Sequence, residues 1–332
     1  MTGLEPGVGI AENYRRFARV EAAGRSPAYE RLALAVADDP VVLGFLLTLP
    51  ALKRQPNLLF AAASFLLGTA PGTGTLRRLV TESPAQLTSV MLARRTQTNE
   101  AARCATLLPA LAGLPEPLAL LEVGAAAGLT LQVDRYSYDY GGHRVAGTDP
   151  QAPTLWCDPR GSVPLPARVP EVCWRAGLDL NPLDAGADDD VRWLTCLLWP
   201  GESGRAERLS AALATARRHR VPVYQGDLLD DLERVATQAP AAATLVVYHS
   251  AVLGYVAEAR RRAFGAAVRA LGAVWLSNEG PEVVAGVTPP AVSEAPGGDG
   301  EAGRQGGFLL VRDGTHPLAR TNPHGMWLEW LA

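Results

Sequence analysis

The first third of the chain has the hydrophobic spacing of α-helices. From Glu12 to about Leu114, apolar residues recur at intervals of three and four positions, and runs of β-branched residues are few. Several prolines in this stretch follow Ser or Asp, which is the order of cap and first helical residue at a helix start. Asn57 stands before a long apolar run and can cap a helix there. The pattern predicts an N-terminal helical domain of about five or six helices over residues 1–112.

The pattern changes near residue 113. Short apolar runs then alternate with amphipathic helical stretches. Such alternation predicts a parallel sheet with helices on both faces, which is an α/β domain of Rossmann-like type over residues 113–332. Apolar runs at 308–314 and 326–331 are expected to end the sheet as an antiparallel hairpin. The predicted strands are 118–124, 171–180, 221–227, 243–250 and 273–280, and the predicted helices are 129–135, 189–199, 203–219 and 259–271.

Two segments interrupt the α/β domain. Residues 136–166 are rich in turn-forming residues and predict an inserted subdomain. Tyr136, Tyr138 and Tyr140 alternate within it, so we expect them on one face of an extended segment, where they pack the insert. Residues 288–307 contain almost no hydrophobic residue and predict a mobile loop, either a surface insert or a lid.

Composition narrows the class of protein and of ligand. The chain has 332 residues, of which 48% are hydrophobic and 20% charged, as in a globular protein. Its net charge of −3 gives no general electrostatic reason to expect nucleic-acid binding, so a small-molecule substrate is the better expectation. Lys53 is the only lysine, which excludes a lysine Schiff base or a phosphate-loop lysine elsewhere in the chain.

Neither a membrane segment nor a metal site is expected from the sequence. The longest apolar stretches, such as 58–67, are shorter than the roughly 18 residues that span a bilayer. The N-terminus lacks the basic and apolar regions of a signal peptide. The cysteines lack the paired spacing of a zinc or redox site, which indicates buried thiols in a reducing cytosol. We therefore expect a cytoplasmic protein.

The end of the first predicted strand carries candidate chemistry, because ligands of an open parallel sheet bind outside the carboxyl ends of its strands. This strand ends at Glu122 and runs into a turn of small residues that includes Gly124, Ala126 and Gly128. Such residues let the backbone turn sharply and let a ligand approach closely. Packing of a helix against the strand is the alternative explanation of these glycines.

Carboxylates follow the next two strands. Asp179, at the end of the second strand, can accept hydrogen bonds from both hydroxyls of a ribose, or it can cap the turn that follows. Asp227, after the third strand, can accept a hydrogen bond from the amino group of an adenine, or it can cap the helix that begins there. Both alternatives stay open at this level.

The fourth and fifth strands end in further polar residues. His249 stands where a general base or an orienting group would lie, although a hydrogen-bonded structural histidine fits the sequence equally well. Tyr248 and Tyr255 can shape a pocket for a cation with their ring faces, or they can simply pack. Asn278 and Glu279 end the fifth strand and form a second catalytic candidate.

Polar side chains in the helical sequence are candidates for binding a second substrate. Asn57, Asn99, Glu100 and Arg103 lie within otherwise apolar helical stretches. Helix caps and a Glu–Arg pair at near-helical spacing explain them as well. The two explanations differ in whether these side chains face the crevice at the strand ends.

Together, the strand-end residues resemble a known family. Glu122-x-Gly124-x-x-x-Gly128, an acid after the second strand and Gly-Asp after the third are similar to motifs of the class I S-adenosylmethionine (SAM)-dependent methyltransferases. Ala126 replaces the middle glycine of the usual first motif. The resemblance covers about residues 112–332 and implies the Rossmann-like fold. It also implies that Glu122, Gly124 and Gly128 border the methionine part of SAM, Asp179 the ribose, and Asp227 and Leu228 the adenine.

A closer resemblance spans nearly the whole chain. Seven segments are similar to those of the bacterial family called domain of unknown function 2332, namely RQPNLLFAAASFLLG, TNEAARCATLLPAL, LLEVGAAAGLTLQVDRYSYDYGG, GLDLNPLD, VYHSAVLGYV, LSNEG and HGMWLEWL. This resemblance implies a family but no activity and no substrate, so the functional hypothesis depends on the strand-end residues.

The leading functional hypothesis is a SAM-dependent transferase, most simply a methyltransferase of a small molecule. SAM is the predicted cofactor, and transfer by in-line displacement needs positioning and desolvation more than covalent help. One alternative is a catalytically degenerate, methyltransferase-like binding or regulatory module. A second alternative keeps SAM but uses it in a reaction other than methyl transfer.

Overall fold

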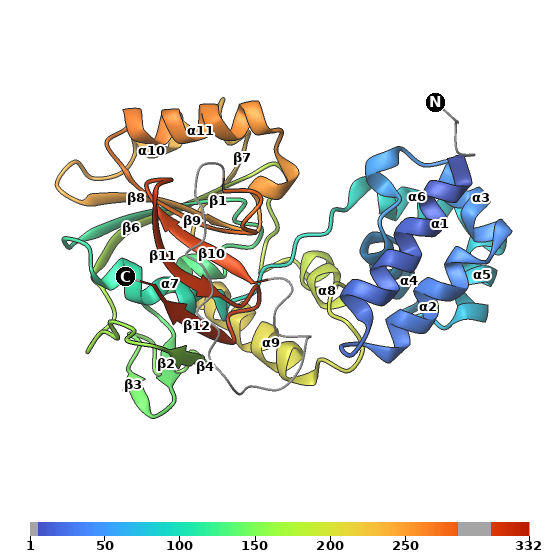
Figure 1. The fold of residues 1–332 in the computed structure, drawn as a ribbon, viewed down its shortest axis with the longest axis horizontal. Helices are drawn as coiled ribbons and strands as arrows, with labels where there is room; N and C mark the ends of the chain where they lie inside the picture. The colour runs from blue at the N-terminus through green and yellow to red at the C-terminus, as the bar shows by residue number, and fades with distance from the viewer. Residues whose placement is uncertain (1–5, 285–306, 332) are drawn as a thin grey trace. The chain divides into compact units, whose positions relative to one another are not determined.

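The computed structural model describes residues 6–284 and 307–331 of the chain (Figure 1). The predicted loop at 288–307 therefore lies almost entirely outside the described residues. The chain divides into two compact units, each with its own internal packing. They are the helical unit, residues 1–98 with 186–207, and the sheet unit, residues 99–185 with 208–332.

This division differs from the predicted boundary near residue 112 in two respects. In place of a boundary near residue 112, α7 (Arg103–Ala112) belongs to the sheet unit. The reason is its packing, because the Arg103 guanidinium donates a hydrogen bond to the carbonyl of Ser250 at 3.1 Å. Residues 186–207, which the alternating pattern had assigned to the α/β domain, belong to the helical unit.

Helices make up most of the helical unit, as the spacing of apolar residues predicts. Helix starts follow the expected chemistry. At the start of α3, Asp39 is the cap and Pro40 is the first helical residue, and Asp39 Oδ1 accepts the N–H of Val41 at 2.9 Å. The helices of this unit are α1 (Pro6–Arg16), α2 (Pro27–Ala37), α3 (Pro40–Leu47), α4 (Pro56–Leu67), α5 (Thr73–Glu82), α6 (Pro84–Ala93) and α8 (Asp188–Cys196).

The prediction that Asn57 caps a helix is wrong. α4 begins one residue earlier, at Pro56, and Gln55 occupies the cap position. The proline supplies the first helical residue because its fixed φ suits that position and its missing N–H is not needed there. Asn57 is therefore inside the first turn, and its Oδ1 is buried without a hydrogen-bond partner among the described atoms.

A nine-stranded sheet forms the centre of the sheet unit, in the order β5-β12-β11-β10-β9-β8-β1-β6-β7. The five strands predicted from apolar runs are confirmed, and they pair parallel to one another. The fold is therefore mixed α/β, with a large central sheet and helices. The parallel strands are β1 (Leu118–Val123), β6 (Val172–Asp179), β7 (Val223–Gln225), β8 (Thr244–Ser250) and β9 (Val274–Glu279).

Three antiparallel strands follow, where a single hairpin was predicted. β10 (Phe308–Arg312) pairs with β9 and with β11 (His316–Thr321), and β12 (Trp327–Trp330) pairs with β11. The sequence of β11, HPLART, has no continuous apolar run, and Leu318 and Ala319 are its only buried hydrophobic residues. Its pairing is thus determined by neighbouring strands and not by its own hydrophobicity.

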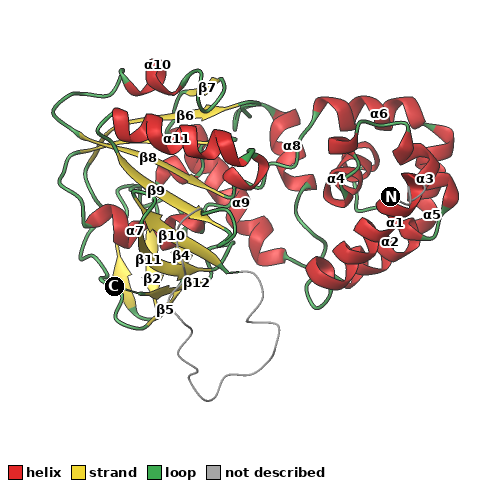
Figure 2. Cartoon of the chain, turned by 45° about the horizontal axis from the view of Figure 1, so that its top comes forward, coloured by secondary structure: helices red, strands yellow, loops and turns green. Residues whose placement is uncertain are grey.

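The two faces of the sheet are covered by different helices (Figures 1 and 2). On one face, α10 (Leu232–Ala236) and α11 (Glu258–Ala270) pack over an apolar core that includes Val247 and Phe264. The other face lies against α7 and carries buried polar side chains, of which Glu122 is one. Candidate site residues thus lie on this face, beside the carboxyl ends of the strands.

The first crossover is not the helix predicted over 129–135. It contains only a short 3₁₀ turn, Thr130–Gln132. Side chains take up the carbonyls that an α-helix would use, since the Tyr136 and Tyr138 hydroxyls donate to the carbonyls of Leu129 and Val133. The helical spacing of this segment reflects burial on several sides and not an α-helix.

The segment 136–166 is an insert, as predicted, and it has a small sheet of its own. β2 (Ser137–Tyr140) lies between β3 (His143–Val145) and β4 (Thr154–Trp156), while β5 (Asp158–Arg160) joins the edge of the main sheet beside β12. The packing role predicted for the tyrosines is confirmed. Tyr136, Tyr138 and Tyr140 are all buried, and the last two stack with ring centres 6.1 Å apart.

Candidate functional site

The loop after β1 is a tight turn with a left-handed backbone at three positions. Gly124, Ala126 and Gly128 have φ values of +72°, +49° and +68°, in the left-handed region that favours glycine. A Cβ on Gly124 would lie 2.3 Å from Cγ2 of Val252, in the segment after β8. Glycine is therefore required at 124 for backbone and for space, whereas Ala126 tolerates its conformation with a small side chain.

Asp179 connects the ends of two neighbouring parallel strands. Its Oδ2 accepts the N–H of Ala126 at 2.8 Å, and its Oδ1 accepts the N–H of Asn181 at 2.7 Å. The turn-capping role is thus confirmed, and the same carboxylate also fixes the loop after β1. Its predicted contact with a ribose stays a prediction, made at the position where the carboxyl ends of β1 and β6 meet.

Asn99 and Glu100 precede α7 and support the same region. Asn99 Oδ1 accepts the N–H groups of Ala127 at 3.3 Å and Leu129 at 3.1 Å. Glu100 accepts a hydrogen bond from Arg208 at 2.7 Å. Asn99 therefore acts on the glycine loop itself, and the structure places it beside the strand ends, whereas Asn57 belongs to the helical unit.

Asp227 caps the turn after β7, so the alternative that it is the N-cap of the next helix is wrong. Its Oδ1 accepts the N–H of Leu229 at 2.8 Å and also pairs with Arg260 at 2.5 Å. The helix α10 itself begins later, with Asp231 in its cap position. Leu228 lies in the apolar core below α10. Contacts of either residue with an adenine stay predictions.

Glu122 is a buried acid on the polar face of the sheet. Only 4% of the residue is exposed, its Oε1 accepts a hydrogen bond from the Thr130 hydroxyl, and its Oε2 has no partner among the described atoms. Burial raises the pKa of Glu122 to about 8, although the hydrogen bond from Thr130 and the charge of Arg103 lower it. Glu122 is thus mostly a neutral acid at pH 7.

Tyr248 lies directly beside Glu122 on the neighbouring strand. The two residues are register partners in the parallel pairing of β1 with β8, so their side chains share one face of the sheet. Tyr248 is 1% exposed, burial raises the pKa of its hydroxyl, and that hydroxyl has no partner in hydrogen-bonding geometry among the described atoms. The Thr130 hydroxyl is a polar neighbour of both side chains.

His249 and Glu279 form a buried pair on the opposite face. The Trp275 indole N–H donates to His249 Nε2 at 3.0 Å, so this ring nitrogen carries no proton. The proton is therefore on Nδ1, which donates to Glu279 Oε1 at 2.7 Å. Both ring nitrogens are used and His249 is fully buried, an arrangement that favours the orienting and structural roles over a general base.

Glu279 in turn holds the segment that packs against the glycine loop. Its Oε1 also accepts the N–H groups of Val252 at 2.7 Å and Leu253 at 3.0 Å. Burial alone would raise the pKa of Glu279, but the hydrogen bonds from His249 and from these backbone groups lower it. Glu279 is thus an ionised anchor that places Val252 against Gly124.

The other two candidates of this edge differ in exposure. Asn278 is fully buried, donates to Ser250 Oγ at 3.1 Å and accepts from the Thr321 hydroxyl at 2.7 Å, so it connects three strands. Tyr255 is 77% exposed at the end of a 3₁₀ turn, and it therefore does not pack as a core residue would. Asn278 is therefore inaccessible to a ligand, whereas Tyr255 presents its ring at the surface.

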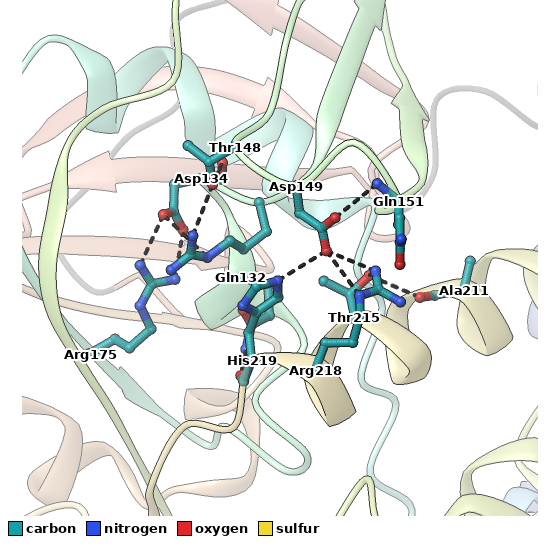
Figure 3. A network of polar contacts seen from close by, with 11 residues as sticks. Gln132, Asp134, Thr148, Asp149, Gln151, Arg175, Ala211, Thr215, Arg218 and His219 are labelled. Carbon is teal, nitrogen blue, oxygen red and sulfur yellow. Dashed lines mark hydrogen bonds and ion pairs between the residues drawn. The ribbon is translucent and has the colours of Figure 1, made fainter.

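A second polar network fastens the insert and the segment before it to β6 and to the last turn of the helix at 203–218 (Figure 3). Asp134 forms a two-pronged ion pair with Arg175 on β6, at 2.6 and 2.9 Å. Asp149 accepts from Arg218 of α9 (Ser203–Arg218) at 2.8 Å and lies 3.0 Å from His219. The hydrogen bond from Arg218 lowers the pKa of Asp149 to about 2. This network holds the chain segment that follows the glycine loop.

Comparison with models of protein families finds a match that covers most of the chain. The model of a family described as an uncharacterized protein conserved in bacteria, domain of unknown function 2332, matches residues 11–330. The chain belongs to this family. Comparisons with curated proteins and with solved structures find no match. In this member of family 2332, no helix within residues 6–284 or 307–331 has both the length and the hydrophobicity of a membrane-spanning segment.

Two residues at the candidate site were not singled out from the sequence. Leu180 follows Asp179 directly and is 53% exposed, although it is a large apolar side chain at the end of a buried strand. Its position right after a strand-end acid was the signal that could have identified it. Thr130, the partner of Glu122, had no such signal, because its role depends on how the segment after Gly128 folds back.

Proposed function

We propose that this member of family 2332 binds SAM at the carboxyl edge of β1 and β6 and transfers its methyl group to a small molecule. One observation carries the proposal. The loop after β1 makes three left-handed turns within five residues, and the carboxylate ending the next parallel strand, Asp179, is bound to that loop at Ala126. Ligands of open parallel sheets bind at this kind of position.

The order of the parallel strands supports the same proposal. Counted along the chain, the strands β7, β6, β1, β8 and β9 follow the order 3-2-1-4-5, which is that of doubly wound nucleotide-binding sheets. The order reverses beside β1, so the glycine loop stands at the switch point. The finer assignment to a class I methyltransferase fold is part of the proposal, since the three antiparallel strands beyond β9 are an additional feature of this chain.

The residues at this edge fit the parts of SAM. Asp179 would hold the ribose hydroxyls, and the exposed side chain of Leu180 would lie against the adenine. The methionine part would lie along the loop from Gly124 to Gly128, although the space beside Gly124 itself is filled by Val252. The unpartnered Oε2 of Glu122 supplies a polar atom beneath that part of the loop. When bound, SAM would supply a methyl group on a positively charged sulfur, which is open to attack by a nucleophile.

The chain's own residues would contribute position and exclusion of water. Glu279, held by His249, fixes the segment that places Val252 against Gly124. Methyl transfer by direct displacement gains most from such fixed alignment, because no covalent enzyme intermediate is needed. Tyr255, with its exposed ring, is the candidate for contact with the acceptor molecule. The free thiols of all four cysteines fit a reducing compartment and support the cytoplasm as the place of action.

One observation favours the binding-module alternative. Asp179 and Asn99 already accept the N–H groups of Ala126, Ala127 and Leu129, which a ligand at this loop would otherwise use. A loop whose N–H groups are all bound by side chains of the same protein can be the remnant of a site that no longer binds its ligand. The experiment must therefore distinguish a site that binds SAM from one that has lost it.

Thermal unfolding with and without ligand makes this distinction. Under the proposal, SAM and S-adenosylhomocysteine raise the Tm of the wild type, because a ligand that binds only the folded state stabilises it. The shift should disappear in Asp179→Ala and persist in Asp184→Asn, an exposed aspartate of the same segment. Cooperative unfolding of the wild type with no shift at millimolar SAM would favour the binding module. Formation of methylthioadenosine from SAM alone would instead indicate the non-methylating chemistry.

A further inference from the structure

Glu122 is enclosed by the same loop that is proposed to bind SAM. The chain leaves β1 just after Glu122, turns through Gly124 and Gly128, and returns so that the Thr130 hydroxyl donates to Glu122 Oε1. The other oxygen, Oε2, faces no described hydrogen-bonding partner. The loop therefore covers the carboxyl group on one side. Its Oε2 has no hydrogen-bond donor or acceptor among the described atoms.

The surroundings of Glu122 keep it as a neutral acid in the absence of ligand. The charge of Arg103 favours the carboxylate, and its guanidinium is shared with the carbonyls of Ser250 and Pro323. The negative charge of Asp179 disfavours the carboxylate. Burial raises the pKa of the remaining neighbours, so they stay neutral near pH 7. These neighbours are Cys104 on α7, Tyr136 before β2, and Tyr248 on β8.

We propose that SAM bound at this loop converts Glu122 from its acid to its carboxylate form, so that binding releases one proton to the solvent. The inference rests on the proposed function. A sulfonium or ammonium group close to a buried carboxyl favours the charged form, because the opposite charge offsets the loss of hydration. Thr130 continues to donate to Oε1, while Oε2 turns from an unused hydroxyl or carbonyl into an acceptor for the cation.

Release of the proton depends on the charge of the ligand. Only a ligand with a positive charge in its amino-acid part would ionise Glu122, whereas methylthioadenosine, which is uncharged there, would bind without proton release. Because burial holds the pKa of Glu122 above 7, release can approach one proton per SAM. The site would thus recognise the charged part of SAM and not only its nucleoside.

Calorimetry in several buffers measures this proton directly. SAM is titrated into the wild type at pH 7.0 in phosphate, HEPES and Tris, and the observed heat is plotted against the ionisation heat of the buffer. We expect release of more than about half a proton per SAM for the wild type and for His316→Gln, a control with an exposed histidine removed. Glu122→Gln, which keeps the size of the side chain, should lose this release while still binding methylthioadenosine.

The outcomes separate the inference from the proposed function. Equal proton release in wild type and Glu122→Gln, with SAM bound by both, overturns the inference and leaves the proposed function intact. No binding of SAM by folded wild type overturns the proposed function and the inference together. If Glu122→Gln does not fold, infrared difference spectroscopy of the wild type decides. The C=O band of a buried protonated carboxyl should disappear when SAM binds, and an unchanged band contradicts the inference.

Discussion

Asp179 at the end of β6 accepts the backbone N–H of Ala126, in the loop after β1, at 2.8 Å. One buried carboxylate thereby joins the carboxyl ends of two parallel strands at the switch point of the sheet. The loop's left-handed backbone at Ala126 is held by this contact, because an alanine alone would favour other conformations. The geometry of the candidate site depends on this connection.

Removal of the Asp179 carboxylate is expected to destabilise the protein even without ligand. Asp179→Ala leaves two N–H groups, those of Ala126 and Asn181, without their acceptors and should lower the free energy of unfolding by about 1–3 kcal/mol. Asp179→Asn keeps one carbonyl acceptor and should cost less. Urea denaturation of both variants, with Asp184→Asn as the exposed control, measures the difference. Equal stability of Asp179→Ala and wild type would contradict the role assigned to this contact.

Gly124 should tolerate no side chain while Val252 is present. Gly124→Ala is expected to cost about 2–4 kcal/mol, because the Cβ adds backbone strain and a clash 2.3 Å from Val252 Cγ2. In a Val252→Ala background the same change should cost only the strain, about 1 kcal/mol. Gly272→Ala is the control, with a similar φ of +67° and no heavy atom within 4 Å of the added Cβ. Identical costs at 124 and 272 would argue against the close approach of Val252.

The raised pKa of Glu122 should make the free energy of unfolding depend on pH. Its pKa is raised from 4.5 in the unfolded chain to about 8 in the folded protein. Its stabilising contribution is therefore complete below pH 4.5 and is lost as pH rises toward 8, by roughly 5 kcal/mol at most. Glu122→Gln should unfold with a weaker pH dependence between pH 5 and 8. Urea denaturation across this range checks the slope, and parallel curves for the two proteins would refute the assignment.

The ion pair of Asp134 and Arg175 should behave as a buried pair (Figure 3). Their side chains are 6% and 11% exposed, so Arg175→Met leaves the buried Asp134 with only the longer contact to Arg135, at 3.7 Å, and should cost about 3 kcal/mol. Adding Asp134→Leu should restore part of the loss. Arg262→Met, from the exposed pair with Glu258, should cost less than about 1 kcal/mol. Additive losses at 134 and 175 in a double-mutant cycle would show that the pair is not coupled.

The strands of the sheet unit could be predicted because each is a short apolar run between turn residues. The central parallel strands β1, β8 and β9 are almost wholly buried, so their hydrophobicity is continuous and visible in the sequence, whereas the edge strand β7 is only partly buried. β11 could not be found in this way, since its polar edge residues pair only because β10 and β12 lie on either side. The same limit applies to the crossover at 130–132, where tyrosine hydroxyls from the following segment take the carbonyls of a would-be helix.

The candidate site was predictable only in part. Strand-end positions identify Glu122, Gly124 and Asp179, because topology alone brings the carboxyl ends of β1 and β6 together. The partner of His249 could not be read from the chain, since Glu279 is 30 positions away and meets it through strand pairing. Nor does a sequence show which nitrogen of His249 is protonated, and this depends on the indole of Trp275. Contacts of this kind decide between a base and a structural histidine.

Titration of the wild-type protein with SAM by calorimetry tests the central claim most directly, with NAD as the comparison ligand. The account predicts saturable binding of one SAM per chain and no comparable heat with NAD, because the loop after β1 lacks the G-x-G-x-x-G spacing of a dinucleotide site. Absence of any saturable heat with millimolar SAM, in protein that unfolds cooperatively, would contradict the claim that this edge of the sheet is a SAM site.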